Sequence, residues 1–144
     1  MTIKILVAYD GSELSKKAIE EVKKQAVEAE EKEVHIVSVV QPTGPATQPA
    51  ISRQMGEEMA EKYAGELEGI KQQLGEDQGT VVTKVLVGEM ERNPGQNICK
   101  YAEEQGADLI IIGSRGFGNV KRILLGSVSS NVVQHATCPV LVMK

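Results

Sequence analysis

Aromatic residues are scarce in this chain of 144 residues, which has no tryptophan, one phenylalanine and three tyrosines. Acidic side chains outnumber basic ones by 20 to 16. Proteins that hold single-stranded nucleic acid usually do so with a basic groove and with aromatic platforms on which the bases stack. The composition therefore argues against nucleic acid as a partner.

Cysteines and long apolar runs are also scarce. The two cysteines, Cys99 and Cys138, lack CxxC spacing, so we expect ordinary buried thiols rather than a disulfide framework or a zinc site. No apolar run approaches the ~18 residues that cross a bilayer. The apolar start from Ile5 to Tyr9 meets Asp10 before the hydrophobic stretch of a secretion signal could form. We therefore expect a cytoplasmic protein that does not enter a membrane.

Five short segments rich in valine and isoleucine are almost continuously apolar, which is typical of parallel strands covered on both faces. They are residues 3–9, 34–40, 81–87, 107–112 and 140–143. Segments with helical periodicity alternate with them, and this order predicts an α/β protein with a parallel sheet and right-handed crossovers. The length fits one domain, which we expect to span residues 1–144.

The predicted helices have recognisable starts and apolar faces. Ser12 and Asn93 are candidate N-caps, and proline follows Asn93 at the first helical position. Between them, an apolar stripe with helical spacing predicts a long second helix, and a fourth helix is expected over residues 127–136. The stripe consists of Met55, Met59, Tyr63, Leu67, Ile70 and Leu74. We interpret Met55, Met59 and Met90 as core residues rather than a ligand surface. Residues 41–51 contain three prolines and should lack regular structure, as either a surface connection or a lid.

The loop after the fourth strand concentrates glycine, hydroxyl groups and positive charge. Gly113 and Gly116 stand at its start and Gly126 and Ser127 at its end, where a helix begins. Arg115, Lys121 and Arg122 lie between them, in a region after residue 106 with four basic and one acidic residue. Free amides at a helix start bind anions, and glycines let them approach the main chain. The pattern favours a phosphate site, although the alternative remains that the glycines form a turn and Ser127 caps the helix.

Two common nucleotide motifs are missing. The residues before Ser127 are Leu125 and Gly126, so the lysine of a P-loop is lacking, and the first strand is followed by Asp10-Gly11-Ser12 rather than by a dinucleotide fingerprint. Asp10 nevertheless ends a strand where open parallel sheets hold ligands, and we favour contact with ribose hydroxyls or a divalent ion over a turn role alone.

No catalytic constellation can be traced. His35 falls inside the second strand and His135 near the end of the fourth helix, where structural roles account for them better than base catalysis does.

The chain as a whole resembles the universal stress protein family, in particular its ATP-binding branch. The resemblance rests on three segments and one motif. The segments are residues 5–15, 107–114 and 138–142, and the motif is Gly113-x2-Gly116-x9-Gly126-Ser127, which keeps every spacing of the family's Gly-x2-Gly-x9-Gly-Ser/Thr signature. Only the stretch from Glu89 to Gly95 departs from the family's usual short Gly-Pro connection.

The resemblance implies a three-layer α/β fold: an open five-stranded parallel sheet in the order 3-2-1-4-5 with helices on both faces. It implies that Val39 binds adenine through its backbone and that Asp10 and Gly113 hold the ribose. The phosphates of ATP, ADP or AMP would be held by Gly116, Gly126, Ser127, Val128 and Ser129. A Mg²⁺ or Mn²⁺ ion at Asp10 would accompany the nucleotide. Arg115 is our own addition as a phosphate-binding cation, inferred from its charge and place.

The last strand is predicted to join two copies of the chain. The family pairs through this strand, and residues 139–143 form a short apolar edge that begins with proline. We expect an antiparallel two-fold dimer that acts as an ATP-binding regulatory or stress-response protein. Hydrolysis should be slow at most, because no group obviously supplies in-line geometry and charge compensation. A nucleotide-independent dimeric scaffold is the alternative, and true ATPase or adenylyl-transfer chemistry is a weaker one.

Overall fold

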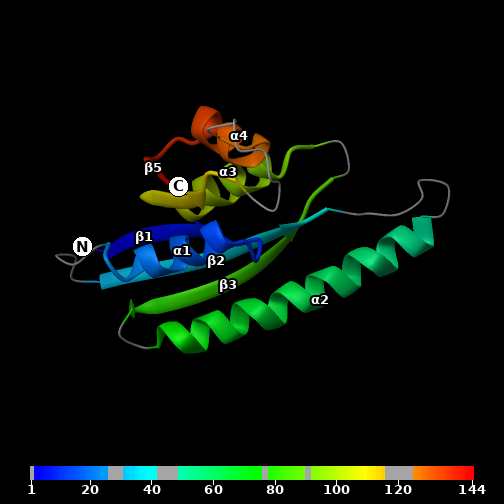
Figure 1. The fold of residues 1–144 in the computed structure, drawn as a ribbon, viewed down its shortest axis with the longest axis horizontal. Helices are drawn as coiled ribbons and strands as arrows, with labels where there is room; N and C mark the ends of the chain where they lie inside the picture. The colour runs from blue at the N-terminus through cyan, green and yellow to red at the C-terminus, as the bar shows by residue number, and fades with distance from the viewer. Residues whose placement is uncertain (1, 26–30, 42–48, 76–77, 90–91, 116–124) are drawn as a thin grey trace.

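A five-stranded parallel sheet forms the centre of the computed structural model, which describes residues 2–25, 31–41, 49–75, 78–89, 92–115 and 125–144 (Figure 1). Its strands are β1 (Thr2–Ala8), β2 (Glu31–Val40), β3 (Thr80–Val87), β4 (Leu109–Gly113) and β5 (Val140–Met143). Their spatial order is β3-β2-β1-β4-β5 and every neighbouring pair is parallel. The expected fold class and strand order are confirmed.

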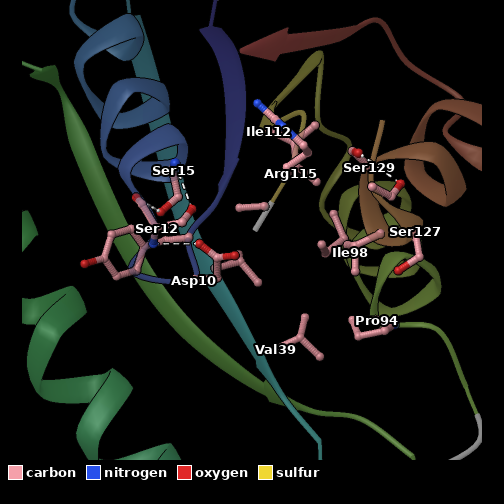
Figure 2. A pocket seen from close by; sticks show the side chains of 16 residues that line it. Asp10, Ser12, Ser15, Val39, Pro94, Ile98, Ile112, Arg115, Ser127 and Ser129 are labelled. Atoms are coloured by element: carbon pink, nitrogen blue, oxygen red, sulfur yellow. Dashed lines mark hydrogen bonds between the residues drawn. The ribbon is translucent and has the colours of Figure 1, made fainter. Parts of the chain in front are cut away.

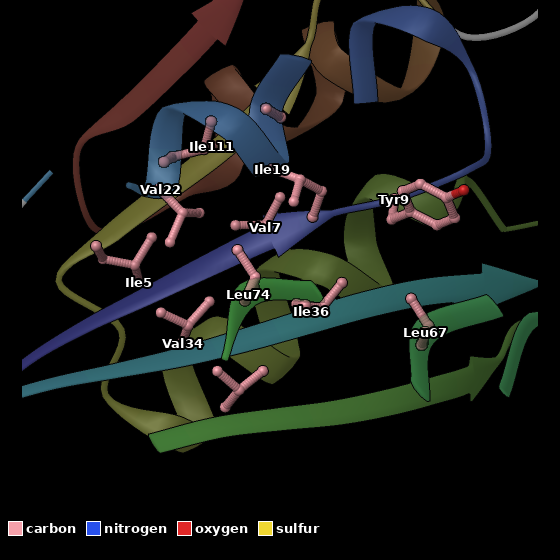
Figure 3. Packing of buried hydrophobic residues seen from close by; sticks show 12 residues of the cluster. Ile5, Val7, Tyr9, Ile19, Val22, Val34, Ile36, Leu67, Leu74 and Ile111 are labelled. Atoms are coloured by element: carbon pink, nitrogen blue, oxygen red, sulfur yellow. The ribbon is translucent and has the colours of Figure 1, made fainter. Parts of the chain in front are cut away.

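Helices cover both faces of the sheet, each over its own apolar core. They are α1 (Glu13–Val22), α2 (Pro49–Leu74), α3 (Pro94–Gln105) and α4 (Ser127–His135). On one face, Ile5 and Val7 of β1 pack with Val22 of α1 and Leu67 of α2 (Figure 3). On the other face, Leu6 and Ala8 pack with residues of α3 and α4. The alternation follows from the strand period of two, which sends neighbouring side chains to opposite faces.

Helix starts follow the predicted chemistry. The Ser12 hydroxyl accepts a hydrogen bond from the Ser15 amide at 3.3 Å, and Asn93 Oδ1 accepts one from the Gly95 amide at 2.8 Å. Pro94 occupies the start of α3, and Gly106 ends that helix with φ of 67°. Both N-caps are therefore confirmed.

Several element bounds differ from the expected ranges by one to three residues, and the expected boundary at the start of α2 is wrong. Helix α2 begins at Pro49, so residues 49–51 are helical rather than irregular. The reason is that proline is well tolerated in the first turn of a helix, where its missing N–H has no partner to lose. Residues 42–48, on which the remaining choice between a connection and a lid depends, lie outside the described residues.

His35 has the structural role expected of it. Its side chain is buried in β2. Nε2 donates to the Glu33 carboxylate at 2.6 Å, and Nδ1 shares a hydrogen bond of 2.7 Å with the Tyr101 hydroxyl. His135 lies at the exposed end of α4, and its Nδ1 donates to the Asn131 carbonyl at 2.9 Å. Neither imidazole lines the cavity described below.

Cys99 and Cys138 are free thiols that are half-buried, less than the full burial expected. Burial, assisted for Cys99 by Cys138 and for Cys138 by Asp108, raises the pKa of both thiols. Over the described parts of the chain, the helices are too short or too polar to cross a bilayer.

Candidate functional site

A cavity of about 320 Å³ opens at the carboxyl edge of the sheet (Figure 2). The strand order reverses between β1 and β4, so the chain leaves these two strands toward opposite faces of the sheet. Open α/β sheets hold ligands in the crevice that forms between such connections. The volume lies in the range of small-molecule sites, about 300–1,000 Å³. The walls consist of Ala8, Tyr9, Asp10, Ser12, Ser15, Val37, Val39, Pro94, Ile98, Ile112, Gly113, Arg115, Gly126, Ser127, Val128 and Ser129.

Most residues singled out from the sequence line this one cavity. They are Asp10, Val39, Gly113, Arg115, Gly126, Ser127, Val128 and Ser129. Gly116, Lys121 and Arg122 lie outside the described residues. Figure 2 places Val39 and Pro94 at one end of the cavity and Arg115 and Ser129 at the other. Val39 and Pro94 are apolar, whereas Arg115 and Ser129 bring a positive charge and a hydroxyl group to the other end.

Asp10 stabilises the turn after β1 and also lines the cavity. Its Oδ1 accepts a hydrogen bond from the Ser12 amide at 2.9 Å, and Gly11 between them has φ of 86°, a conformation that glycine adopts without strain. The Tyr63 hydroxyl of α2 donates to the Asp10 carbonyl at 3.2 Å. These contacts fix the carboxylate at the cavity wall.

The start of α4 differs from the other helix starts at this edge. Gly126 is its N-cap, with φ of −74° and ψ of 174°, and no side chain among the described residues caps the helix. Ser127 is the first helical residue, so the interpretation of Ser127 as a cap is wrong. The first amides of a helix have no partner within it. Ser127, Val128 and Ser129, which carry the first amides of α4, line the cavity.

Contacts to Ser114 hold the α4 start in place. The Gly126 amide donates to the Ser114 carbonyl at 2.6 Å, and the buried Ser129 hydroxyl donates to the same oxygen at 2.7 Å. Because its proton is engaged there, Ser129 can offer a phosphate oxygen only its main-chain amide.

Packing against α1 explains why residue 113 is a glycine. A Cβ at this position would stand 2.8 Å from Leu14 Cβ, closer than atoms of that kind approach. Gly126 is different, because the nearest described atoms to its added Cβ would be the Ser114 carbonyl oxygen at 3.4 Å, Arg115 Cα at 3.6 Å and Ser129 Oγ at 3.9 Å, all at van der Waals distance. Glycine at 113 is required by the fold, whereas glycine at 126 is not.

Asn93, next to Pro94 of the cavity wall, has a role besides the N-cap expected from the sequence. While Oδ1 caps α3, Nδ2 donates to the Ser127 carbonyl at 3.3 Å. One side chain thus ties the start of α3 to the start of α4. The sequence gives no signal for the second contact, because it depends on how the two helices pack.

Asn93→Ser should weaken binding of an anionic ligand by about three- to tenfold, the value of one hydrogen bond of ~0.5–1.5 kcal/mol. Serine caps α3 as well as asparagine does but cannot reach Ser127, so the melting temperature should change little. Calorimetric titration with ATP and thermal unfolding of the two proteins measure both. Equal affinities would show that the contact to Ser127 positions nothing.

Two tyrosines beside Asp10 are held in their neutral form. Burial, then Glu66 and Asp10, raise the pKa of Tyr9, and burial, then Asp10, Glu66 and Tyr9, raise the pKa of Tyr63. A raised phenol pKa gives stability that is complete below the unfolded value near pH ~10 and is lost as the pH rises through the folded value. Lys32, whose pKa burial lowers, acts in the opposite direction in the same range.

Tyr63→Phe should therefore flatten the alkaline loss of stability. Urea unfolding of both proteins between about pH 9 and about pH 11.5 isolates the Tyr63 contribution, because Lys32 and Tyr9 are common to both. The difference in free energy of unfolding should shift in favour of the variant as the pH rises. A difference that stays constant over this range contradicts the raised pKa.

The described residues contain no group of three or more His, Cys, Asp or Glu side chains that could hold a metal ion alone. Asp10 is the carboxylate in the cavity wall. One carboxylate together with phosphate oxygens and water is a common Mg²⁺ environment, so this wall fits a metal that arrives with a nucleotide.

These features define an α/β protein with a ligand cavity at the reversal point of its sheet, walled by a helix start that no described side chain caps. The model of the Universal stress protein family matches residues 1–144, and the chain belongs to that family. Universal stress protein YxiE of Bacillus subtilis is 34% identical over 98% of this chain and 98% of its own.

Solved structures of the family share the fold. That of MJ0577 superposes with a TM-score of 0.86 at 35% identity, covering 99% of this chain and 95% of the other. In sequence, Universal stress protein MJ0577 of Methanocaldococcus jannaschii is 43% identical over 86 residues, which are 60% of this chain and 51% of that protein. A universal stress protein in complex with cAMP has a TM-score of 0.65 at 23% identity, covering 98% and 95% of the two chains.

Proposed function

We propose that this protein binds an adenine nucleotide, ATP in the first place, in the cavity at the carboxyl edge of the sheet. The observation that carries the proposal is the start of α4, which lines the cavity, has no cap from a described side chain and begins with the Gly126-Ser127 step of the family signature. A polyanion supplies the acceptors that this helix start lacks. The family relative in complex with cAMP supports an adenine nucleotide as the ligand.

The polarity of the cavity gives the nucleotide its direction. The base lies against the apolar side chains of Val39, Pro94 and Ile98. The reason is that the transfer of its ring faces from water to apolar surroundings is favourable. The ribose lies at the middle, where Asp10 accepts hydrogen bonds from its hydroxyls, beside Gly113.

The phosphates lie at the α4 end. The amides of residues 127–129 and the Arg115 guanidinium bind them there, Gly126 lets them approach the main chain, and Gly116 is a further donor by the family signature. Asp10, together with phosphate oxygens and water, would hold a Mg²⁺ ion, which would neutralise part of the phosphate charge.

A regulatory role fits this site better than a dedicated enzyme does. Neither histidine lines the cavity, and the described wall offers Asp10 and Arg115 as its charged side chains. Transfer of a phosphoryl group requires a positioned nucleophile and several compensating charges. Hydrolysis is therefore slow at most, and the bound nucleotide changes the surface that partners meet.

The protein acts as a dimer joined along β5. On one side this strand pairs with β4. The Pro139 carbonyl accepts a hydrogen bond from the Ile110 amide of β4, and the Met143 carbonyl accepts one from the amide of Ser114, which follows β4. The strand alternation directs the main-chain groups of Val140 and Val142 to the other side, an edge with which none of the described strands pairs. Antiparallel pairing with the same edge of a second copy satisfies these groups on a two-fold axis.

Calorimetric titration of nucleotide-free protein with MgATP tests the proposal, with ADP and AMP as competitors. We expect one site per chain, and weaker binding as phosphates are removed, since each phosphate adds charge for the α4 amides. No heat with any of the three nucleotides would leave the alternative, a dimeric scaffold in which the glycine loop only packs. The contact of Gly113 with Leu14 is the observation that favours that alternative.

A further inference from the structure

Helix α2 is longer than the sheet it covers. Its 26 residues extend about 39 Å at ~1.5 Å per residue, whereas the 8 residues of β3 extend about 26 Å at ~3.3 Å per residue. Figure 1 shows the N-terminal half of α2 running past the ends of β2 and β3. The apolar stripe of the helix therefore continues beyond the core.

The two methionines of that stripe are exposed, contrary to the expectation of core residues. Met55 is 41% and Met59 37% exposed, whereas Leu67 of the same stripe is fully buried. The reason is the overhang, which leaves no strand beneath the methionines. Met90 lies outside the described residues.

These methionines line a groove of about 540 Å³ between α2 and the end of β2. Val40 and Tyr63 complete its apolar wall, and Glu58 and Lys62 lie at its polar fringe. Methionine is unbranched and polarizable, and it adapts to flat or irregular apolar groups. The volume of the groove lies in the range of small-molecule sites, so a ring system fits it. A stable protein interface instead needs a surface that buries about 800 Å² on each partner.

The groove adjoins the nucleotide cavity. Val39 and Pro94 line both, and they stand at the apolar end of the cavity in Figure 2. Tyr63, which lines the groove, donates its hydroxyl proton to the Asp10 carbonyl at the cavity wall. A substituent on a base bound at the Val39 end of the cavity would therefore extend past the end of β2 into the groove.

We propose that the groove of Met55, Met59 and Tyr63 is a second subsite, which accepts an apolar group carried on the base of the bound nucleotide. The inference rests on the proposed function, because it needs the base at the Val39 end. The ligand class is an adenine nucleotide with an apolar substituent on the base, and the substituent packs against the two thioethers and the tyrosine ring.

N6-benzyl-ATP and ATP are the probes, titrated separately into nucleotide-free protein. The benzyl compound should bind about tenfold more tightly, since its ring leaves water for the groove. The double variant Met55→Ala/Met59→Ala should lose most of this gain and keep the ATP affinity within about twofold. Val87→Ala is the matched control, because Val87 is an equally apolar, exposed side chain that lines neither hollow; it should keep the gain.

Three results would overturn the subsite: weaker binding of N6-benzyl-ATP than of ATP, a gain that survives in the double variant, or a change in oligomeric state of the ligand-free double variant. The last would assign the groove to a second copy of the chain. Failure of both nucleotides to bind is a different result, because it contradicts the nucleotide cavity itself.

Discussion

Gly126→Ala is expected to lower the affinity for ATP at least tenfold while the protein stays folded. The added methyl group occupies the cavity wall at the head of α4, where a phosphate must come within hydrogen-bond distance of the amides. Loss of one charge-assisted hydrogen bond, ~1.5–3 kcal/mol, accounts for a factor of about ten to a hundred. The fold tolerates the change, since the backbone is extended and the new atom meets the Ser114 carbonyl oxygen at 3.4 Å. Calorimetric titration with MgATP measures the effect.

Two other glycines give the controls for Gly126→Ala. Gly65→Ala adds a methyl group on α2 with no atom within 4 Å, so ATP affinity should be unchanged and the helix slightly more stable. Gly113→Ala places its Cβ 2.8 Å from Leu14 Cβ and should lower the melting temperature first. Unchanged ATP binding by folded Gly126→Ala would refute the phosphate site at α4.

Val142→Pro is expected to convert the dimer into a monomer. Met143 and Pro139 hold β5 to β4, so the main-chain N–H of Val142 points to the open edge by the alternation of a parallel ladder. Proline removes that donor and places its ring where a second strand must lie, but it leaves the bonds to β4 intact. The dissociation constant should rise by about a hundredfold or more, as several edge hydrogen bonds and their packing are lost together.

Sedimentation equilibrium at micromolar concentration measures this change, with circular dichroism to check the fold. Val133→Ala, an exposed apolar residue on α4 rather than on β5, is the control and should remain dimeric. A Val142→Pro protein that still sediments as a dimer would place the interface elsewhere, and a monomeric parent protein would contradict the dimer itself.

The fold was predictable because local and global signals agree. The strand segments are apolar on both faces, which is typical of buried parallel strands. Ser12, Asn93 and Pro94 indicate helix starts, because the capping contacts that they make lie within one helical turn. The start of α2 was missed because three prolines close together favour an irregular segment, and only the structure shows that Pro49 stands at the one helical position that suits it.

The cavity wall was predictable where the spacing of the family signature places residues at the strand end and the helix start, as at Gly113 and Gly126. It was not predictable where it depends on packing between elements far apart in the sequence. The contact of Asn93 with Ser127, and the exposure of Met55 and Met59, follow from how α3 meets α4 and from the overhang of α2. Sequence periodicity assigns a residue to a helix face but does not say whether anything covers that face.

The central claim is that the first amides of α4 bind the phosphates of an adenine nucleotide, and ¹H–¹⁵N correlation spectra of the protein titrated with MgATP test it most directly. The account predicts that the amide signals of Ser127, Val128 and Ser129 shift downfield and saturate together, while that of Gly106, at the far end of α3, stays in place. Saturable binding of ATP with these three signals unmoved would contradict it.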